Sequence, residues 1–188
     1  MTLPATDDRN ADQIAYWNGP GGRHWTERQQ LQDIVLAPVS EILIDRAAVK
    51  AGETAIDVGC GCGQTTLDLA ARVGSEGQVT GVDISEPMLA VARARPTPAG
   101  AALPAFLDRD AQTADLGEGV LDAVFSRFGV MFFSDPPAAF ANLRKALKPG
   151  GRLTFVCWRP YPENLWMRAP MEAAQPFLPP IPPADPTA

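Results

Sequence analysis

An acidic residue and three glycines at alternate positions form the stretch Asp57-Val-Gly-Cys-Gly-Cys-Gly63. A β-prone apolar run precedes this stretch and a helix-like sequence follows it, which predicts a strand, a tight turn and a helix N-terminus. Because Gly59, Gly61 and Gly63 have no Cβ, the backbone can turn sharply and a ligand can approach it closely. Unpaired N–H groups and the positive end of a helix dipole then point at one spot. The stretch therefore predicts a binding site for a polar or anionic group.

Two common phosphate-binding patterns do not fully match this turn. A P-loop needs a lysine followed by serine or threonine after its last glycine, and Gln64-Thr65 stands there instead. A dinucleotide-binding turn has glycine at its sixth position, where this chain again has Gln64, so that interpretation is weakened but stays open. A glycine-rich turn that only connects a strand to a helix is the structural alternative.

Two further acidic positions follow later predicted strands. Asp83 ends the strand predicted over 78–82, about 20 residues beyond the glycines, where a carboxylate can accept hydrogen bonds from both hydroxyls of a ribose. The alternative is that Asp83 only caps the next helix, for which Ser85 is the expected N-cap. Asp110 follows the short strand predicted over 105–107. An acid there borders the same crevice, because ligands of open α/β sheets bind at the carboxyl ends of the strands.

The elements that must position these residues alternate along the chain. Strands are predicted over 54–58, 78–82, 105–107, 120–125 and 152–158, with helices between them. This alternation predicts an α/β fold with a doubly wound, mostly parallel sheet. Before the first strand, residues 11–45 are expected to be helical, with a break at 18–22 and a kink or split at Pro38. This segment can fold back over the ligand.

The predicted domain organisation has three parts: a helical lid over 1–45, a core over 46–158 and a proline-rich tail over 159–188. The prolines of the tail leave room for one short helix near 165–174, followed by an extended segment.

Five motifs occur in an order and spacing that resemble the class I S-adenosylmethionine-dependent methyltransferases, especially the small-molecule branch that includes the quinone-biosynthesis methyltransferases. These motifs are IDVGCGCG, GVDIS-PML, the Asp110-Ala111 pair, SRFGVMFF-DP and LKPGGRL, which together cover most of residues 50–158. The resemblance implies a Rossmann-like core and S-adenosylmethionine as the cofactor.

The resemblance also assigns residues to the parts of this cofactor. They are Asp57, Gly59 and Gly61 for the methionine part, Asp83 for the ribose, Ile84, Asp110 and Ala111 for the adenine, and Ser126 for the methyl-donor end. No catalytic residue is assigned, because methyl transfer depends mainly on positioning. His24, the only histidine, is a candidate base, and its alternative is a solvated loop residue. Trp17 or Phe128 could stabilise the sulfonium, although tryptophans in the lid are equally expected as ordinary packing residues.

Composition narrows the range of partners. The 188 residues are 46% hydrophobic and carry a net charge of −6 without any basic run, so we expect one globular domain that acts on a small molecule and does not bind nucleic acid. No apolar run is long enough for a membrane span, and Met1 to Asn10 lack a signal-peptide pattern, which predicts a cytoplasmic protein. The three cysteines have no zinc-like spacing, so no metal is expected.

One feature departs from the family. The family fold continues past its fifth strand with a helix and an antiparallel strand pair, whereas this sequence has only the proline-rich tail. The fifth strand would then be an apolar edge. We therefore expect a chain shortened at its C-terminus, either a fragment or a protein that covers this edge by forming a homo-oligomer. Besides the small-molecule methyltransferase, two functions stay open: a nicotinamide-dependent oxidoreductase and a non-catalytic S-adenosylmethionine-binding module.

Overall fold

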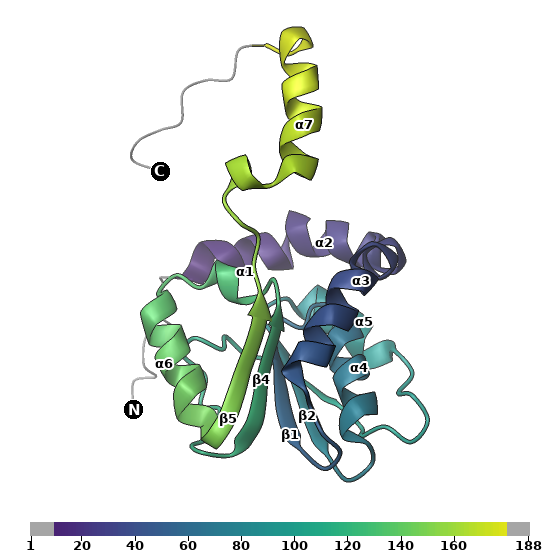
Figure 1. Ribbon diagram of the computed structural model, residues 1–188, viewed down its shortest axis with the longest axis vertical. Coiled ribbons are helices and arrows are strands. Elements are labelled where there is room, and N and C mark those ends of the chain that lie inside the picture. Colours follow the sequence, from purple (N-terminus) through teal and green to yellow (C-terminus); the bar gives the residue numbers. More distant parts are fainter. Residues whose placement is uncertain (1–9, 180–188) are drawn as a thin grey trace. The chain divides into compact units, whose positions relative to one another are not determined.

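A computed structural model describes residues 10–179 of the chain (Figure 1). These residues divide into two compact units, with the boundary between Cys157 and Trp158. The first unit contains the sheet and its helices. The second contains the short helices η3 (Tyr161–Glu163), α7 (Leu165–Ala174) and η4 (Gln175–Phe177). Helix α7 is the short helix that the sequence predicts, while residues 180–188 of the predicted tail lie outside the described residues.

A five-stranded parallel sheet is the centre of the first unit, which confirms the predicted fold class. Its strands are β1 (Thr54–Val58), β2 (Gln78–Asp83), β3 (Ala105–Asp108), β4 (Leu121–Arg127) and β5 (Leu147–Val156). They lie in the order β3-β2-β1-β4-β5, so the chain moves outward in one direction from β1 and in the other direction from β4. Ligands of such sheets bind at the carboxyl ends of the strands where this direction changes.

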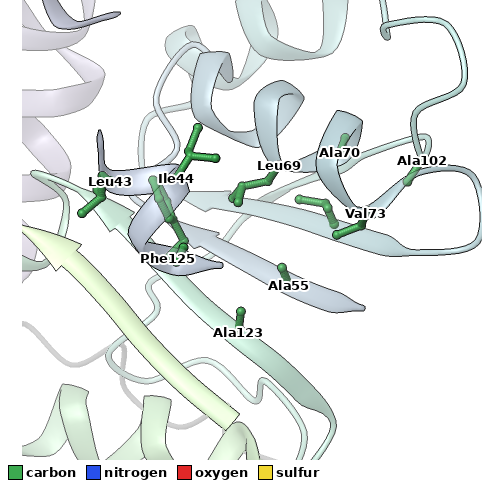
Figure 2. Packing of buried hydrophobic residues seen from close by; sticks show 11 residues of the cluster. Leu43, Ile44, Ala55, Leu69, Ala70, Val73, Ala102, Ala123 and Phe125 are labelled. Atoms are coloured by element: carbon green, nitrogen blue, oxygen red, sulfur yellow. The ribbon is translucent and has the colours of Figure 1, made fainter. Parts of the chain in front are cut away.

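Helices cover both faces of the sheet. On one face, Leu43 and Ile44 of α3 (Gln29–Ala47) and Leu69 of α4 (Gln64–Val73) pack over strand residues that include Phe125 (Figure 2). On the opposite face, Leu143 of α6 (Pro136–Ala146) packs against residues of β1 and β4. Helix α5 (Glu86–Ala94) joins β2 to β3, and a short helix η2 (Val130–Phe132) follows β4. The strands are therefore buried between two helical layers, as a parallel sheet requires.

Two short helices precede α3 and lie across the carboxyl ends of the strands: α1 (Ala11–Asn18) and α2 (Pro20–Glu27) (Figure 1). The break predicted over 18–22 is confined to Gly19, because α1 includes Asn18 and α2 begins with Pro20. Of the two alternatives predicted at Pro38, the split is wrong, since α3 is one helix of 19 residues, and the kink stays a prediction. Pro38 and Ile34, one turn earlier, both lie on the exposed side, where water can hydrate a carbonyl that lacks a backbone donor.

Strand β5 begins at Leu147, five residues before its predicted start, because Leu147 pairs with Leu121 ahead of an irregularity in the β4–β5 ladder. It forms one edge of the sheet, and Phe155 on it is 44% exposed. Among residues 10–179, no helix is both long and apolar enough to cross a membrane.

Candidate functional site

The glycine turn after β1 needs glycine for two physical reasons. Gly59, Gly61 and Gly63 all adopt positive φ angles, of 69°, 54° and 84°. A Cβ on Gly59 would also lie 2.6 Å from the Cα of Gly129, in the loop after β4. The N–H groups of Gly59 and Cys60 both donate to the Val82 carbonyl, at 2.9 and 3.1 Å. The turn is thus fastened to the end of β2 and approaches the loop after β4 closely.

The Asp83 carboxylate at the end of β2 is oriented by two backbone donors. Its Oδ2 accepts from the Gly61 N–H at 2.7 Å, and its Oδ1 accepts from the Ser85 N–H at 2.9 Å. Burial raises the pKa of Asp83, and these two hydrogen bonds oppose that shift. The residue remains partly exposed, so its oxygens can accept further hydrogen bonds. The carboxylate is therefore held beside the glycine turn, and its predicted role toward a ribose stays a prediction.

Asp57 on β1 is fully buried and only half satisfied. Its Oδ2 accepts from the hydroxyls of Thr65 and Thr66, each at 2.7 Å, while its Oδ1 has no hydrogen-bond partner within the described residues. Burial raises the pKa of Asp57 to about 6, against the opposing effect of the two threonine hydroxyls. A buried oxygen without a donor is costly, and an ammonium group would satisfy it. The sequence prediction missed both threonines, although their place in the first turn of α4 is a signal that could have found them.

The loop after β3 carries Asp110 and Ala111. The Asp110 Oδ1 accepts from the Gln112 N–H at 2.9 Å, and its Oδ2 accepts from the Asn10 side-chain amide at 2.8 Å. The Ala111 carbonyl accepts from the Asn142 amide of α6 at 2.9 Å. Asn10 and Asn142 are therefore two residues that sequence reasoning missed, because a side-chain amide that meets a distant partner leaves no local pattern.

Ser126, assigned by resemblance to the methyl-donor end, is fully buried on β4. Its hydroxyl donates to the Val58 carbonyl at 2.7 Å and accepts from the N–H groups of Gly129 and Val130, at 3.1 and 3.2 Å. This hydroxyl joins the ends of β1 and β4 to the loop that follows. Its assignment to the cofactor is not tested by these contacts and stays a prediction.

Helices α1 and α2 are fastened to the segment that follows Asp83. The Asn18 amide donates to the Ile84 carbonyl at 2.7 Å, and its oxygen accepts from the Glu86 N–H at 3.0 Å. The Ser85 hydroxyl donates to the Trp17 carbonyl at 2.7 Å. A Cβ on Gly22 would lie 2.0 Å from that same carbonyl oxygen, so the glycine permits close packing of α2. Helices α1 and α2, the predicted lid, therefore contact the segment that follows Asp83.

Aromatic rings connect the lid to the loop after β4. The ring of Trp17 lies 5.1 Å from that of Phe132 and 6.4 Å from that of Trp25, both edge-on, at 76° and 74°. His24 is exposed on α2. Phe128 has a left-handed backbone, with a φ angle of 65°. Its expected role toward the sulfonium, like that of Trp17, stays a prediction.

The thiols of the glycine turn are unsuited to redox or metal chemistry. Burial raises the pKa of Cys62 to about 12 and that of Cys60 well above its usual value, so both stay protonated near neutrality. In the part of the chain that the structure describes, no group of three His, Cys, Asp or Glu residues could hold a metal ion.

The structure thus places predicted site residues of three adjacent strands at the carboxyl ends of those strands. Asp57 and Asp83 lie at the ends of β1 and β2, which are joined through the glycine turn, and Asp110 follows β3 by two residues. The unpartnered Asp57 oxygen agrees with a cofactor that carries an ammonium group.

Comparison with known proteins identifies the family. A family model described as "Methyltransferase domain" matches residues 55–151, from β1 into β5. The chain belongs to this methyltransferase-domain family. S-adenosylmethionine is the cofactor that this membership indicates, and no nicotinamide is needed to explain the acidic strand ends.

Named relatives agree with this family. The chain is 33% identical over 119 residues to an aklanonic acid methyltransferase of a Streptomyces strain, an alignment that covers 63% of this chain and 54% of that protein. It is 35% identical over 139 residues to a demethylmenaquinone methyltransferase of Thermus thermophilus, covering 72% and 62%. A crystal structure of a SAM-dependent methyltransferase from Aquifex aeolicus matches with a TM-score of 0.58 and 26% identity, over 64% of each chain. The chain thus spans little more than half the length of these relatives.

Proposed function

We propose that this chain is an S-adenosylmethionine-dependent methyltransferase that transfers a methyl group to a small-molecule acceptor. The observation that carries the proposal is the Asp83 carboxylate, which the Gly61 N–H holds beside the glycine turn at 2.7 Å. A carboxylate in this position can accept hydrogen bonds from two ribose hydroxyls, and each such bond is worth roughly 1.5–3 kcal/mol.

The other site residues take roles that follow from their surroundings. The unpaired Asp57 oxygen accepts from the ammonium of the methionine part, and the turn through Gly59 and Gly61 borders that part. Asp110 and Ala111 meet the edge of the adenine, and Ile84 lies against its face. Ser126 borders the methyl-donor end.

When bound, the cofactor supplies a methyl group on a sulfonium, and the protein has to align the acceptor with it. Positioning of this kind supplies up to about 7–11 kcal/mol in favourable cases. Lid helices that lie across the strand ends can exclude water from the reacting groups. His24 is the candidate base for an acceptor that must lose a proton.

The acceptor is proposed to be a small, largely apolar molecule. The names of two relatives, an aklanonic acid methyltransferase and a demethylmenaquinone methyltransferase, support this class. The net charge of −6 argues against a nucleic-acid partner. A cytoplasmic location is proposed on the sequence alone.

Two experiments test the proposal. Calorimetry should detect 1:1 binding of S-adenosylhomocysteine and no binding of NADH. Incubation with methyl-labelled S-adenosylmethionine and a panel of quinols and polyketide phenols should transfer label to at least one acceptor, and an Asp83→Ala protein should transfer none. Binding of NADH in preference to S-adenosylhomocysteine would contradict the proposed function.

A second candidate is a non-catalytic S-adenosylmethionine-binding module, which would bind the cofactor and transfer no methyl group to any acceptor. Strand β5, at an edge of the sheet with a 44% exposed Phe155, would in either case allow pairing with a second copy. Sedimentation analysis that finds only monomers at micromolar concentration would contradict a homo-oligomer.

A further inference from the structure

Trp25 belongs to the last turn of α2 and lies beside the glycine turn. Its indole Nε1 is 4.0 Å from the position that a Cβ on Gly61 would occupy. The ring is partly buried and packs edge-on against Trp17. Trp25 therefore lies beside the backbone that the cofactor is expected to approach.

The two lid tryptophans differ in how their indole N–H groups are used. The N–H of Trp17 donates to the Gln13 side chain at 3.2 Å, within α1. Within residues 10–179, the N–H of Trp25 donates to no acceptor. An indole N–H can only donate, so it needs an oxygen or nitrogen acceptor from outside these residues, which water or a ligand can supply.

The position of the Trp25 N–H limits which group of the cofactor it can contact. Asp57 and Asp83, on either side of the glycine turn, are acceptors and therefore suit the donor groups of the cofactor, its ammonium and its ribose hydroxyls. The carboxylate of the methionine part is the acceptor-only group of the same cofactor. Carboxylate side chains cannot hold it, and the N–H groups of Gly59, Cys60, Gly61 and Gly63 already donate within the protein, so a further donor beside the turn suits this group.

We propose that the Trp25 indole N–H binds the carboxylate of the methionine part of S-adenosylmethionine. The lid then contributes a binding group as well as a cover. The Asn18 and Ser85 hydrogen bonds, of 2.7 Å each to Ile84 and Trp17, fix α1 and α2 so that Trp25 stays beside Gly61. This inference rests on the proposed function, because it assigns one part of the same cofactor.

The test compares two ligands that differ only in the amino-acid part. S-adenosylhomocysteine carries the carboxylate, whereas 5′-methylthioadenosine keeps the adenosine and lacks the whole amino-acid part. Trp25→Phe keeps an aromatic ring and removes the N–H. Calorimetry should show about a tenfold weaker affinity for S-adenosylhomocysteine, as expected for a lost hydrogen bond to a charged group, and an unchanged affinity for 5′-methylthioadenosine.

Trp17→Phe is the matched control, because it removes an N–H that is paired inside the lid. It should change the affinities for the two ligands by the same factor. Equal losses for both ligands in Trp25→Phe would show that Trp25 only packs, and unchanged affinities would show that it makes no contact; either result overturns the inference.

A measurement on the unaltered protein covers the case in which Trp25→Phe does not fold. The assigned indole N–H resonance of Trp25 should shift on addition of S-adenosylhomocysteine and stay in place with 5′-methylthioadenosine, and equal shifts would contradict the inference. Failure of the wild-type protein to bind either ligand would instead contradict the proposed function itself, so the two failures are distinguishable.

Discussion

The glycine turn and the lid are held in place by different kinds of contacts. The acid before the turn has partners close in sequence, since Asp57 meets Thr65 and Thr66, eight and nine residues later, while the turn itself is joined to Val82 and Asp83 on β2. The lid depends on partners far away, since Asn18 meets the Ile84 carbonyl across 66 residues and Asn10 meets Asp110 across 100. A local motif can therefore encode part of the turn, whereas the contacts of α1 and α2 join residues that lie far apart in the sequence.

If the residues around the glycine turn provide most of the cofactor affinity, replacing their carboxylates should lower that affinity more than replacing any residue of α1 or α2. Asp83→Ala removes the acceptor of the ribose hydroxyls and the partner of the Gly61 N–H, so S-adenosylhomocysteine affinity should fall by about 100-fold or more in calorimetry. Asp108→Ala is the matched control, because Asp108 pairs in register with Asp83 on the next strand and is exposed. A similar loss in both variants would contradict a specific role for Asp83.

The Asp57→Asn variant should bind the cofactor more weakly without losing stability. The neutral amide keeps the shape of the side chain but no longer attracts the ammonium, so we expect roughly a tenfold loss of cofactor affinity. The variant also avoids burying a charge, so its free energy of unfolding at pH 7 should equal or exceed that of the wild type in urea titrations. A variant that binds normally would remove Asp57 from the site.

The pH dependence of stability gives an independent test of the Asp57 environment. Burial raises its pKa from 3.8 to about 6, so the folded protein binds this proton more tightly than the unfolded chain does. Its contribution to stability is then fully present below pH 3.8 and is lost as the pH rises to about 6, by about 3 kcal/mol.

Glu53 and Asp122, whose pKa values are lowered first of all by hydrogen bonds from Arg152 and Lys148, act in the opposite direction. Urea titrations of the wild type and of Asp57→Asn across this range isolate the Asp57 contribution as their difference. A difference that does not change with pH would show that Asp57 is not titrating there.

The lid should have the smallest effect on the cofactor. Asn18→Ala removes two hydrogen bonds to the turn after Asp83, each worth about 0.5–1.5 kcal/mol, part of which water replaces. S-adenosylhomocysteine affinity should fall by about threefold to fivefold, measured by calorimetry. Asp12→Ala on the exposed side of α1 serves as the control and should leave the affinity unchanged. A loss as large as that of Asp83→Ala would reverse the ranking of the two regions.

The same contrast explains what could be predicted from the sequence. Thr54–Val58 and Gln64–Val73 were predictable to the residue, because apolar runs and glycines mark both ends. The early start of β5 was missed because Pro149 and Gly150 suggest a turn, whereas pairing with Leu121 overrides that preference.

The candidate site likewise has a part that the sequence predicts and a part that it does not. The acids at the strand ends follow from the motif, since parallel strands bring their carboxyl ends to one edge. The amides of Asn10, Asn18 and Asn142 could not be predicted, because each meets a partner 28 to 100 residues away and nothing in the adjacent sequence signals it.

The most direct test of the cofactor site is a titration of isotope-labelled protein with S-adenosylhomocysteine, followed by the backbone N–H resonances. The resonances of Gly59, Gly61, Asp83 and Ala111 should move together with one dissociation constant, while those at the amino end of β5 should not move. Shifts confined to β5 or α6, with the glycine turn unchanged, would contradict the account.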